Sequence, residues 1–63
     1  MGARQEQILR RLRDTTCNVA TFELDIETSG ALTALERDGW IDVLLLPLLA
    51  DGRLRANAYL KRL

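Results

Sequence analysis

The 63 residues carry nine basic and nine acidic side chains, one cysteine and no histidine, for a net charge of zero. A single cysteine excludes an internal disulfide and the lack of histidine excludes a Cys/His metal site, so no metal or cofactor is predicted. An apolar fraction of 48% with 29% charged residues is typical of a folded globular chain. We expect one domain, residues 1–63. Because so short a chain buries only about 60% of its unfolded surface, we also expect oligomerisation to supplement the small core.

The charges divide the chain into three segments. Residues 1–13 carry a net +3 and residues 52–63 a net +4, whereas residues 14–51 carry eight carboxylates against one arginine, a net −7. If the termini lie together, one face is basic and another acidic; the alternative is that scattered charges merely solvate a small surface. The polar start and the short longest apolar run, residues 43–50, indicate neither a signal peptide nor a membrane span. We therefore expect a cytoplasmic protein without a membrane partner.

The first predicted element is a helix in the stretch ARQEQILRRLRDTT, residues 3–16. Ile8, Leu9 and Leu12 form the narrow apolar stripe of a surface helix. The helix should end near Asp14, because the Thr-Thr-Cys-Asn run that follows contains weak helix formers that compete for backbone hydrogen bonds.

The next segment, residues 19–27, fits two structures. Phe22, Leu24 and Ile26 alternate with acidic residues, which indicates a half-buried strand. Val19, Phe22 and Ile26 fit a short helix equally well, with Thr21 as its N-cap and acidic groups in its first turn. The helix is the preferred interpretation.

A further helix is predicted to begin at Thr28 or Ser29, either of which can cap it. Its apolar stripe consists of Ala31, Leu32 and Leu35. Gly39 ends it in the left-handed conformation that glycine adopts without strain, and Trp40 then folds back on the last turn.

The stretch DVLLLPLLADGRLR, Asp42 to Arg55, predicts a β-hairpin rather than the tail of a helix. A helix would hold Pro47 in its interior at a cost of about 3 kcal/mol, whereas an edge strand accepts it. Asp51-Gly52 is a strong signal for a two-residue turn. On the resulting core face lie the predicted pairs Val43–Leu60, Leu45–Ala58, Pro47–Ala56 and Leu49–Leu54.

This register leaves three leucines, Leu44, Leu46 and Leu48, on the outer face, where Tyr59 lies opposite Leu44 and Asn57 opposite Leu46. Three exposed leucines and a tyrosine in one hairpin indicate an interface, and a homodimer is the first interpretation. A terminal segment that covers them, or a register slipped by one residue, is the alternative.

The chain resembles the compact winged helix-turn-helix proteins of phages and prophages. The matching residues are Thr21, Glu23 and Leu24, the segment LERDGW at 35–40, the wing tip DGR at 51–53, and Tyr59. The resemblance covers about two-thirds of the chain. It implies an α+β fold of two to three helices plus a C-terminal β-hairpin, and a small regulator of phage or mobile-element origin that binds double-stranded DNA.

The same resemblance assigns DNA contacts residue by residue. The helix before Gly39 would offer bases and phosphates the side chains Ser29, Thr33 and Arg37. The wing would grip the DNA backbone with Arg53 and Arg55, and the first helix would add phosphate contacts from Arg10, Arg11 and Arg13.

Departures from this pattern favour a second interpretation. The helix that would enter the major groove carries a single arginine, Arg37, and phosphates repel its acidic neighbours Glu36 and Asp38. A winged-helix protein-interaction module is therefore the alternative, such as a phage-encoded inhibitor of a host nucleic-acid-binding complex. Its acidic middle segment would face a basic host protein, and the hairpin leucines would anchor it. An enzyme is not expected, because no histidine or glycine-rich phosphate loop is present and Cys17 has no evident base nearby.

Overall fold

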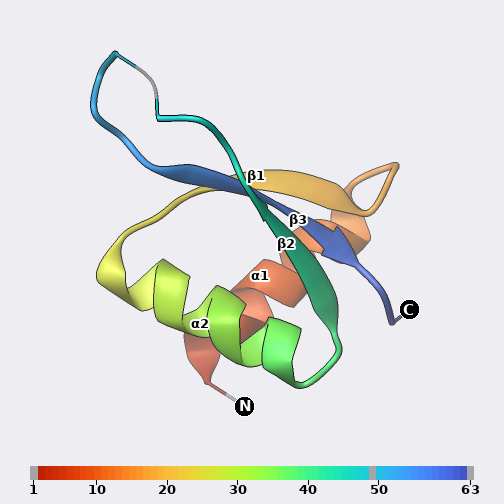
Figure 1. The fold of residues 1–63 in the computed structure, drawn as a ribbon. Helices are drawn as coiled ribbons and strands as arrows, with labels where there is room; N and C mark the ends of the chain where they lie inside the picture. The colour runs from red at the N-terminus through yellow and green to blue at the C-terminus, as the bar shows by residue number, and fades with distance from the viewer. Residues whose placement is uncertain (1, 49, 63) are drawn as a thin grey trace.

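The protein forms two helices beneath a three-stranded antiparallel sheet (Figure 1), in a computed structural model that describes residues 2–48 and 50–62. The elements in chain order are α1 (Ala3–Asp14), β1 (Val19–Glu23), α2 (Ile26–Arg37), β2 (Ile41–Leu45) and β3 (Arg55–Leu60). β3 is the central strand, between β1 and β2. The fold is α+β and compatible with a small winged helix, although the described residues contain only two helices.

The core lies between the helices and the inner face of the sheet. Its buried members are Ile8, Leu9, Leu12, Ala20, Phe22, Ala31, Leu32, Leu35, Ile41 and Ala58. The predicted first helix is confirmed, with its apolar stripe inward. It ends where the Thr15 hydroxyl donates to the Leu12 carbonyl (2.9 Å) and accepts from the Val19 backbone N–H (3.1 Å). These two bonds join the end of α1 to the start of β1.

The preferred helix over residues 19–27 is wrong, because residues 19–23 form a strand. β1 pairs with β3, so that Ala20 lies opposite Ala58 and Phe22 opposite Ala56. The alternation that the helix interpretation set aside is the pattern of this half-buried strand. Thr21 is not a helix cap but a strand residue, whose hydroxyl contacts the Asn57 side-chain oxygen at 2.7 Å.

Helix α2 begins earlier than predicted and has a different cap. The Asp25 carboxylate accepts a hydrogen bond from the Thr28 backbone N–H at 2.7 Å, so neither Thr28 nor Ser29 is the N-cap. The end of the helix is as predicted. Gly39 has φ of +82°, and the Trp40 N–H donates to the Leu35 carbonyl at 3.0 Å. This bond holds Trp40 against the last turn.

The predicted hairpin forms, but its register differs by two residues and its turn is longer. Val43 lies opposite Ala58 and Leu44 opposite Asn57. A shift of two keeps every side chain on its predicted face, because strand faces alternate with period two. The predicted two-residue turn is wrong: the Asp51 carboxylate accepts from the Arg53 N–H (3.0 Å) and from the Arg55 guanidinium (2.9 Å) within the connection at 46–54.

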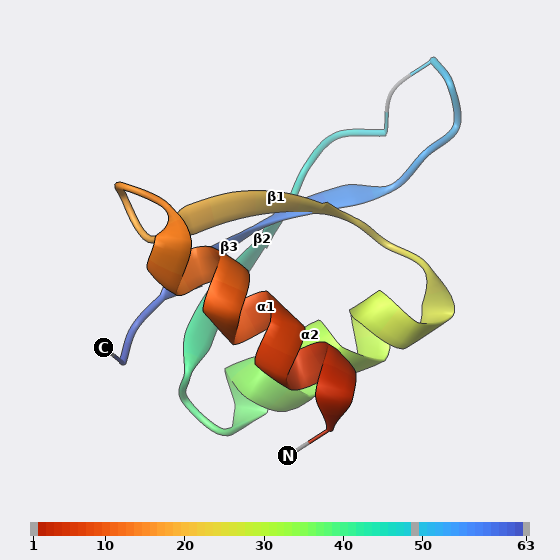
Figure 2. The same cartoon turned by 180° about the vertical axis from the view of Figure 1, so that it is seen from behind.

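Two core predictions for the hairpin are corrected. Pro47 lies in the connection after β2 rather than inside an edge strand. Leu45 is on the inner face yet 70% exposed. The connection that follows β2 extends beyond the helices, as Figure 2 shows from behind. Leu49, also predicted for the core face, lies outside the described residues.

Candidate functional site

The three predicted DNA-contacting residues of α2 share one exposed face, as their spacing of four residues requires. The Thr33 hydroxyl donates to the Ser29 carbonyl at 2.9 Å, and Arg37 Nε lies 3.8 Å from an Asp38 carboxylate oxygen. Next to them, the Glu36 carboxylate accepts the N–H of Val43 at 3.1 Å. The structure therefore brings the set together but pairs its only cation, Arg37, with the Asp38 carboxylate.

The two predicted wing arginines are also paired with acids. Arg53 Nη1 lies 3.0 Å from Glu23 Oε1, and Arg55 Nη2 lies 2.9 Å from Asp51 Oδ2. The pKa of the Asp51 carboxyl is lowered, chiefly by the Arg53 backbone N–H and then by Arg55. A phosphate would have to compete with these carboxylates for the same donors.

The three arginines predicted on α1 do not form one phosphate-binding row. The guanidinium of Arg11 lies over the Phe22 ring, 4.7 Å from its centroid. Arg10 and Arg13 instead border a pocket near the start of β2. In the part of the chain that the structure describes, no carboxylate lies within ion-pair distance of Arg10 or Arg13.

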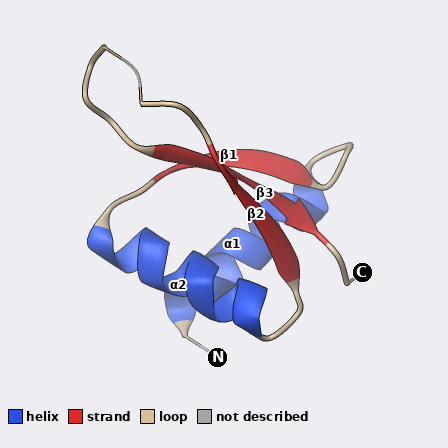
Figure 3. Cartoon of the chain, viewed as in Figure 1, coloured by secondary structure: helices blue, strands red, loops and turns tan. Residues whose placement is uncertain are grey.

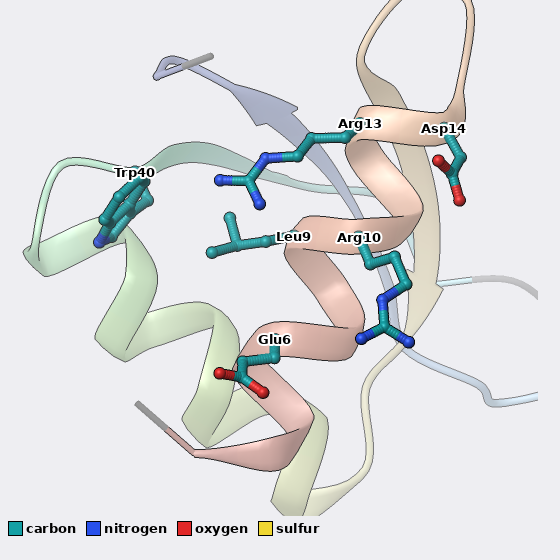
Figure 4. Close-up of a pocket in the computed structure, with 6 residues that line it drawn as sticks. All are labelled: Glu6, Leu9, Arg10, Arg13, Asp14 and Trp40. Atoms are coloured by element: carbon teal, nitrogen blue, oxygen red, sulfur yellow. The ribbon is translucent and has the colours of Figure 1, made fainter.

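The pocket beside α1 has a volume of about 400 Å³. Its lining consists of Glu6, Leu9, Arg10, Arg13, Asp14 and Trp40, and we call it the arginine–tryptophan pocket. Leu9 and Arg13 point from α1 toward Trp40, while Arg10 extends along the other side of the helix (Figure 4). Arg62 adds a further cation, 5.1 Å from the centroid of the Trp40 ring.

Sequence reasoning identified Arg10 and Arg13 but missed Trp40 and Arg62 as members of a site. Trp40 was interpreted as the hydrophobic contact of a helix cap, which it is. Its second role depends on the backbone N–H of Lys61, which donates to the Trp40 carbonyl at 2.9 Å and places Arg62 over the ring. The available signal was the basic charge of the two ends of the chain, which would form one basic face if the ends lay together.

A second surface consists of apolar side chains at the far end of the hairpin. We define the wing as residues 44–54; its exposed leucines are Leu44 (55% exposed), Leu45 (70%), Leu48 (63%) and Leu54 (54%). Ile26, at the start of α2, is 96% exposed. The Leu24 N–H donates to the Leu54 carbonyl at 2.9 Å, which ties the wing to the segment just before α2.

The predicted interface residues are only partly together on this surface. Leu44 and Leu48 are exposed as predicted, whereas Leu46 and Tyr59 are half-buried. The predicted Leu44–Tyr59 pair is wrong, because Tyr59 lies opposite Asp42 and Val19. Leu45, Leu54 and Ile26 were missed, since the residue pattern does not show where the helical layer beneath the sheet ends.

Comparisons with protein families, curated proteins and solved structures found no match. The described residues form an α+β domain with two helices and a three-stranded antiparallel sheet, a fold that is compatible with a small winged helix. Among residues 2–48 and 50–62 no helix is long and apolar enough to cross a membrane. The same residues contain no cluster of three or more potential metal ligands.

Proposed function

We propose that the chain is a protein-interaction module of the winged-helix type that docks its wing on an apolar surface of a basic host protein. The observation that carries the proposal is the concentration of four leucines, each more than half exposed, on one projecting hairpin. Apolar patches of this kind on small domains mark interaction surfaces. Burying such leucines against a partner contributes about 1.5–3 kcal/mol for each side chain that becomes fully covered.

The charge of the neighbouring surface supports a basic partner. Ile26 lies between Asp25 and Glu27, and all three are exposed at the start of α2. The cations near the wing, Arg53 and Arg55, are already paired with carboxylates. Proteins that bind nucleic acids have the complementary basic surface, so a phage-encoded inhibitor of a host nucleic-acid-binding complex fits this arrangement.

Affinity capture from the native host tests the proposal. The wild-type chain should retain a basic protein, and the variant L45S/L48S should lose it, because the anchor side chains are removed. The matched control is Q7S/T16S, which changes two exposed uncharged residues away from the wing and should retain the partner. Equal capture by all three proteins, or no captured protein at all, would contradict the proposal.

The homodimer prediction offers an alternative, in which the wing binds a second copy of the chain. Sedimentation of the wild type and of L48E at several concentrations separates the two cases. A dimer that L48E converts to a monomer would assign the wing to self-association, whereas a monomer in both leaves the surface to a different protein.

The second candidate function is the small DNA-binding regulator, which is favoured by Arg10 and Arg13, two α1 arginines that have neither a carboxylate partner nor an aromatic contact among the described residues. Arg10 and Arg13 would contact phosphates, and Ser29, Thr33 and Arg37 would face the major groove. Titration with mixed duplex DNA across salt concentrations tests this function. Retardation that weakens with added salt is expected, because each neutralised phosphate releases counterions. Absence of retardation at low salt would rule the function out.

A further inference from the structure

The two arginines that line the arginine–tryptophan pocket have neither a carboxylate partner nor an aromatic contact among the described residues. Five other cations of the described chain each pair with a carboxylate within 4.0 Å; they are Arg4, Arg37, Arg53, Arg55 and Lys61. Arg10 and Arg13 have no such partner among the described residues, although both line the pocket. Their guanidinium donors are therefore available to an anion from outside the chain.

The backbone of Trp40, whose ring forms the aromatic wall of the pocket, is held at two points. Its backbone N–H donates to the Leu35 carbonyl, and its carbonyl accepts from the Lys61 backbone N–H at 2.9 Å. Leu9, which is 3% exposed, forms an apolar surface between α1 and the ring. A ring on a capped helix end loses little freedom when a ligand stacks on it, so a planar ligand meets a preformed platform.

The pocket also contains acceptors. Glu6 and Asp14 line it together with the arginines, so both signs of charge meet in about 400 Å³. That volume lies in the range of small-ligand sites, roughly 300–1,000 Å³. A ligand with several adjacent phosphates would be repelled by the two carboxylates. A ligand with one phosphate, a planar ring and exocyclic amines would match the arginines, the tryptophan and the carboxylates in turn.

We propose that the arginine–tryptophan pocket binds one unpaired nucleotide of a nucleic-acid single strand. The base lies against the face of Trp40 that lines the pocket, its exocyclic groups face Glu6, and the adjoining phosphate contacts Arg13. Sequence-tolerant binding of single strands uses this combination of a stacking ring and backbone cations. Because duplex bases are stacked on one another, double-stranded DNA cannot use the platform. The site is separate from the wing and independent of the partner proposed for it.

The intrinsic fluorescence of Trp40, the only tryptophan in the chain, reports binding directly. Titration with a short single-stranded oligonucleotide should quench it saturably, with DNA and RNA strands as separate arms. The matched duplex and inorganic phosphate should quench it far less. A phosphotyrosine peptide forms a further arm, since it offers a ring and a phosphate but no base amines. Saturation by that peptide and not by the single strand would overturn the proposal.

Variants separate a specific contact from a general effect of charge. Anisotropy of a labelled single strand should show about tenfold weaker binding for W40L, which keeps an apolar side chain but removes the stacking ring. R13Q should weaken binding several-fold. The control R4Q makes the same charge change on the same helix, at an arginine that is paired with Glu27 at 3.3 Å, and should bind like the wild type.

Thermal unfolding of each variant establishes that it is folded before binding is compared. If W40L unfolds at the assay temperature, R13Q against R4Q still decides the question, because both replace exposed or half-exposed polar groups. Equal weakening by R13Q and R4Q would reduce the interaction to net charge and overturn the proposal. Quenching that is linear and never saturates would overturn it as well.

Discussion

Leucine has opposite roles in the body of the domain and in the wing. In the body, Leu12 and Leu35 are 0% and 1% exposed and lie between the helices and the sheet, whereas Leu45 in the wing is 70% exposed. Figure 3 shows the reason: both helices lie under one part of the sheet, and the connection between β2 and β3 extends beyond them. The stability of the fold therefore resides in the body, and its apolar binding capacity in the wing.

Two residues on the same face of a sheet can therefore differ widely in burial. Leu45 is on the inner face of β2, two pairs along from Val43, and has the same strand partner, β3. Both side chains line a small pocket of about 70 Å³ beside α2, yet Val43 is half-buried and Leu45 is exposed. Core-type residues are therefore left open to solvent where the strand enters the wing.

The largest expected effect contrasts the two leucines directly. L35A should lower the free energy of unfolding by about 2–5 kcal/mol, because it removes a buried side chain and leaves a cavity. In a domain this small, that loss is enough to unfold much of the protein. L45A should change the free energy of unfolding by less than about 0.5 kcal/mol, as exposed substitutions usually do.

Urea denaturation followed by circular dichroism measures both variants against the wild type. A large loss for L45A at low protein concentration would mean that the wing is part of the core. If the loss for L45A instead grows with protein concentration, the wild-type wing is buried in a self-associated form, since oligomer stability depends on concentration.

Sequence reasoning succeeded where the signal was local. Helix α1 has its apolar stripe within twelve residues, and Gly39 carries its own conformational signal. The faces of the hairpin also follow from local alternation. β1 was misassigned because its partner is remote: Thr21 contacts Asn57, 36 positions away. Helix and strand fit residues 19–27 equally well from the local pattern. Pairing with β3, more than 30 positions away, decides for the strand.

The predicted site was limited by the same cause. The side chains of Ser29, Thr33 and Arg37 could be placed on one helix face from their spacing alone. Whether an arginine is free to bind a phosphate depends on carboxylates brought near it by the fold, as Glu23 is to Arg53 (3.0 Å). Pairing of charges across 30 positions is a tertiary property, so the sequence pattern does not show which arginines remain without a carboxylate partner.

A smaller effect separates the two glycines with positive φ. Gly39 ends α2 with φ of +82° and Gly52 lies in the wing with φ of +75°. G39A should destabilise the fold by about 1 kcal/mol, because an L-residue is strained there and Trp40 depends on that turn. The added Cβ itself finds room, since its nearest neighbour is an Arg62 side-chain nitrogen at 3.7 Å.

G52A introduces similar strain into a connection that packs on little of the core. The wing can relax around it, so we expect a smaller loss of stability than for G39A. Thermal unfolding of the two variants side by side measures the difference. An equal or larger loss for G52A would indicate that the wing unfolds together with the body and is held more tightly than its exposure implies.

The smallest expected effect is the pH dependence that the cap of α2 contributes. The pKa of the Asp25 carboxyl is lowered in the folded protein, first by the hydrogen bond from the Thr28 backbone N–H and then by the Thr28 hydroxyl, with a minor contribution from Arg4. A lowered folded pKa means that this stabilisation is complete above the unfolded value of about 3.9 and is lost as the pH falls through the folded value. D25N keeps a capping oxygen but cannot titrate. Below about pH 3 the urea midpoint of D25N should therefore resemble that of the wild type. Between about pH 4 and 6 the midpoint of D25N should be slightly lower.

D51N in the wing is the matched comparison, because the pKa of Asp51 is lowered by the equivalent Arg53 N–H bond. Since the wing contributes little to the cooperative core, D51N should alter the pH profile less than D25N, and the reverse order would place the wing inside the folding unit.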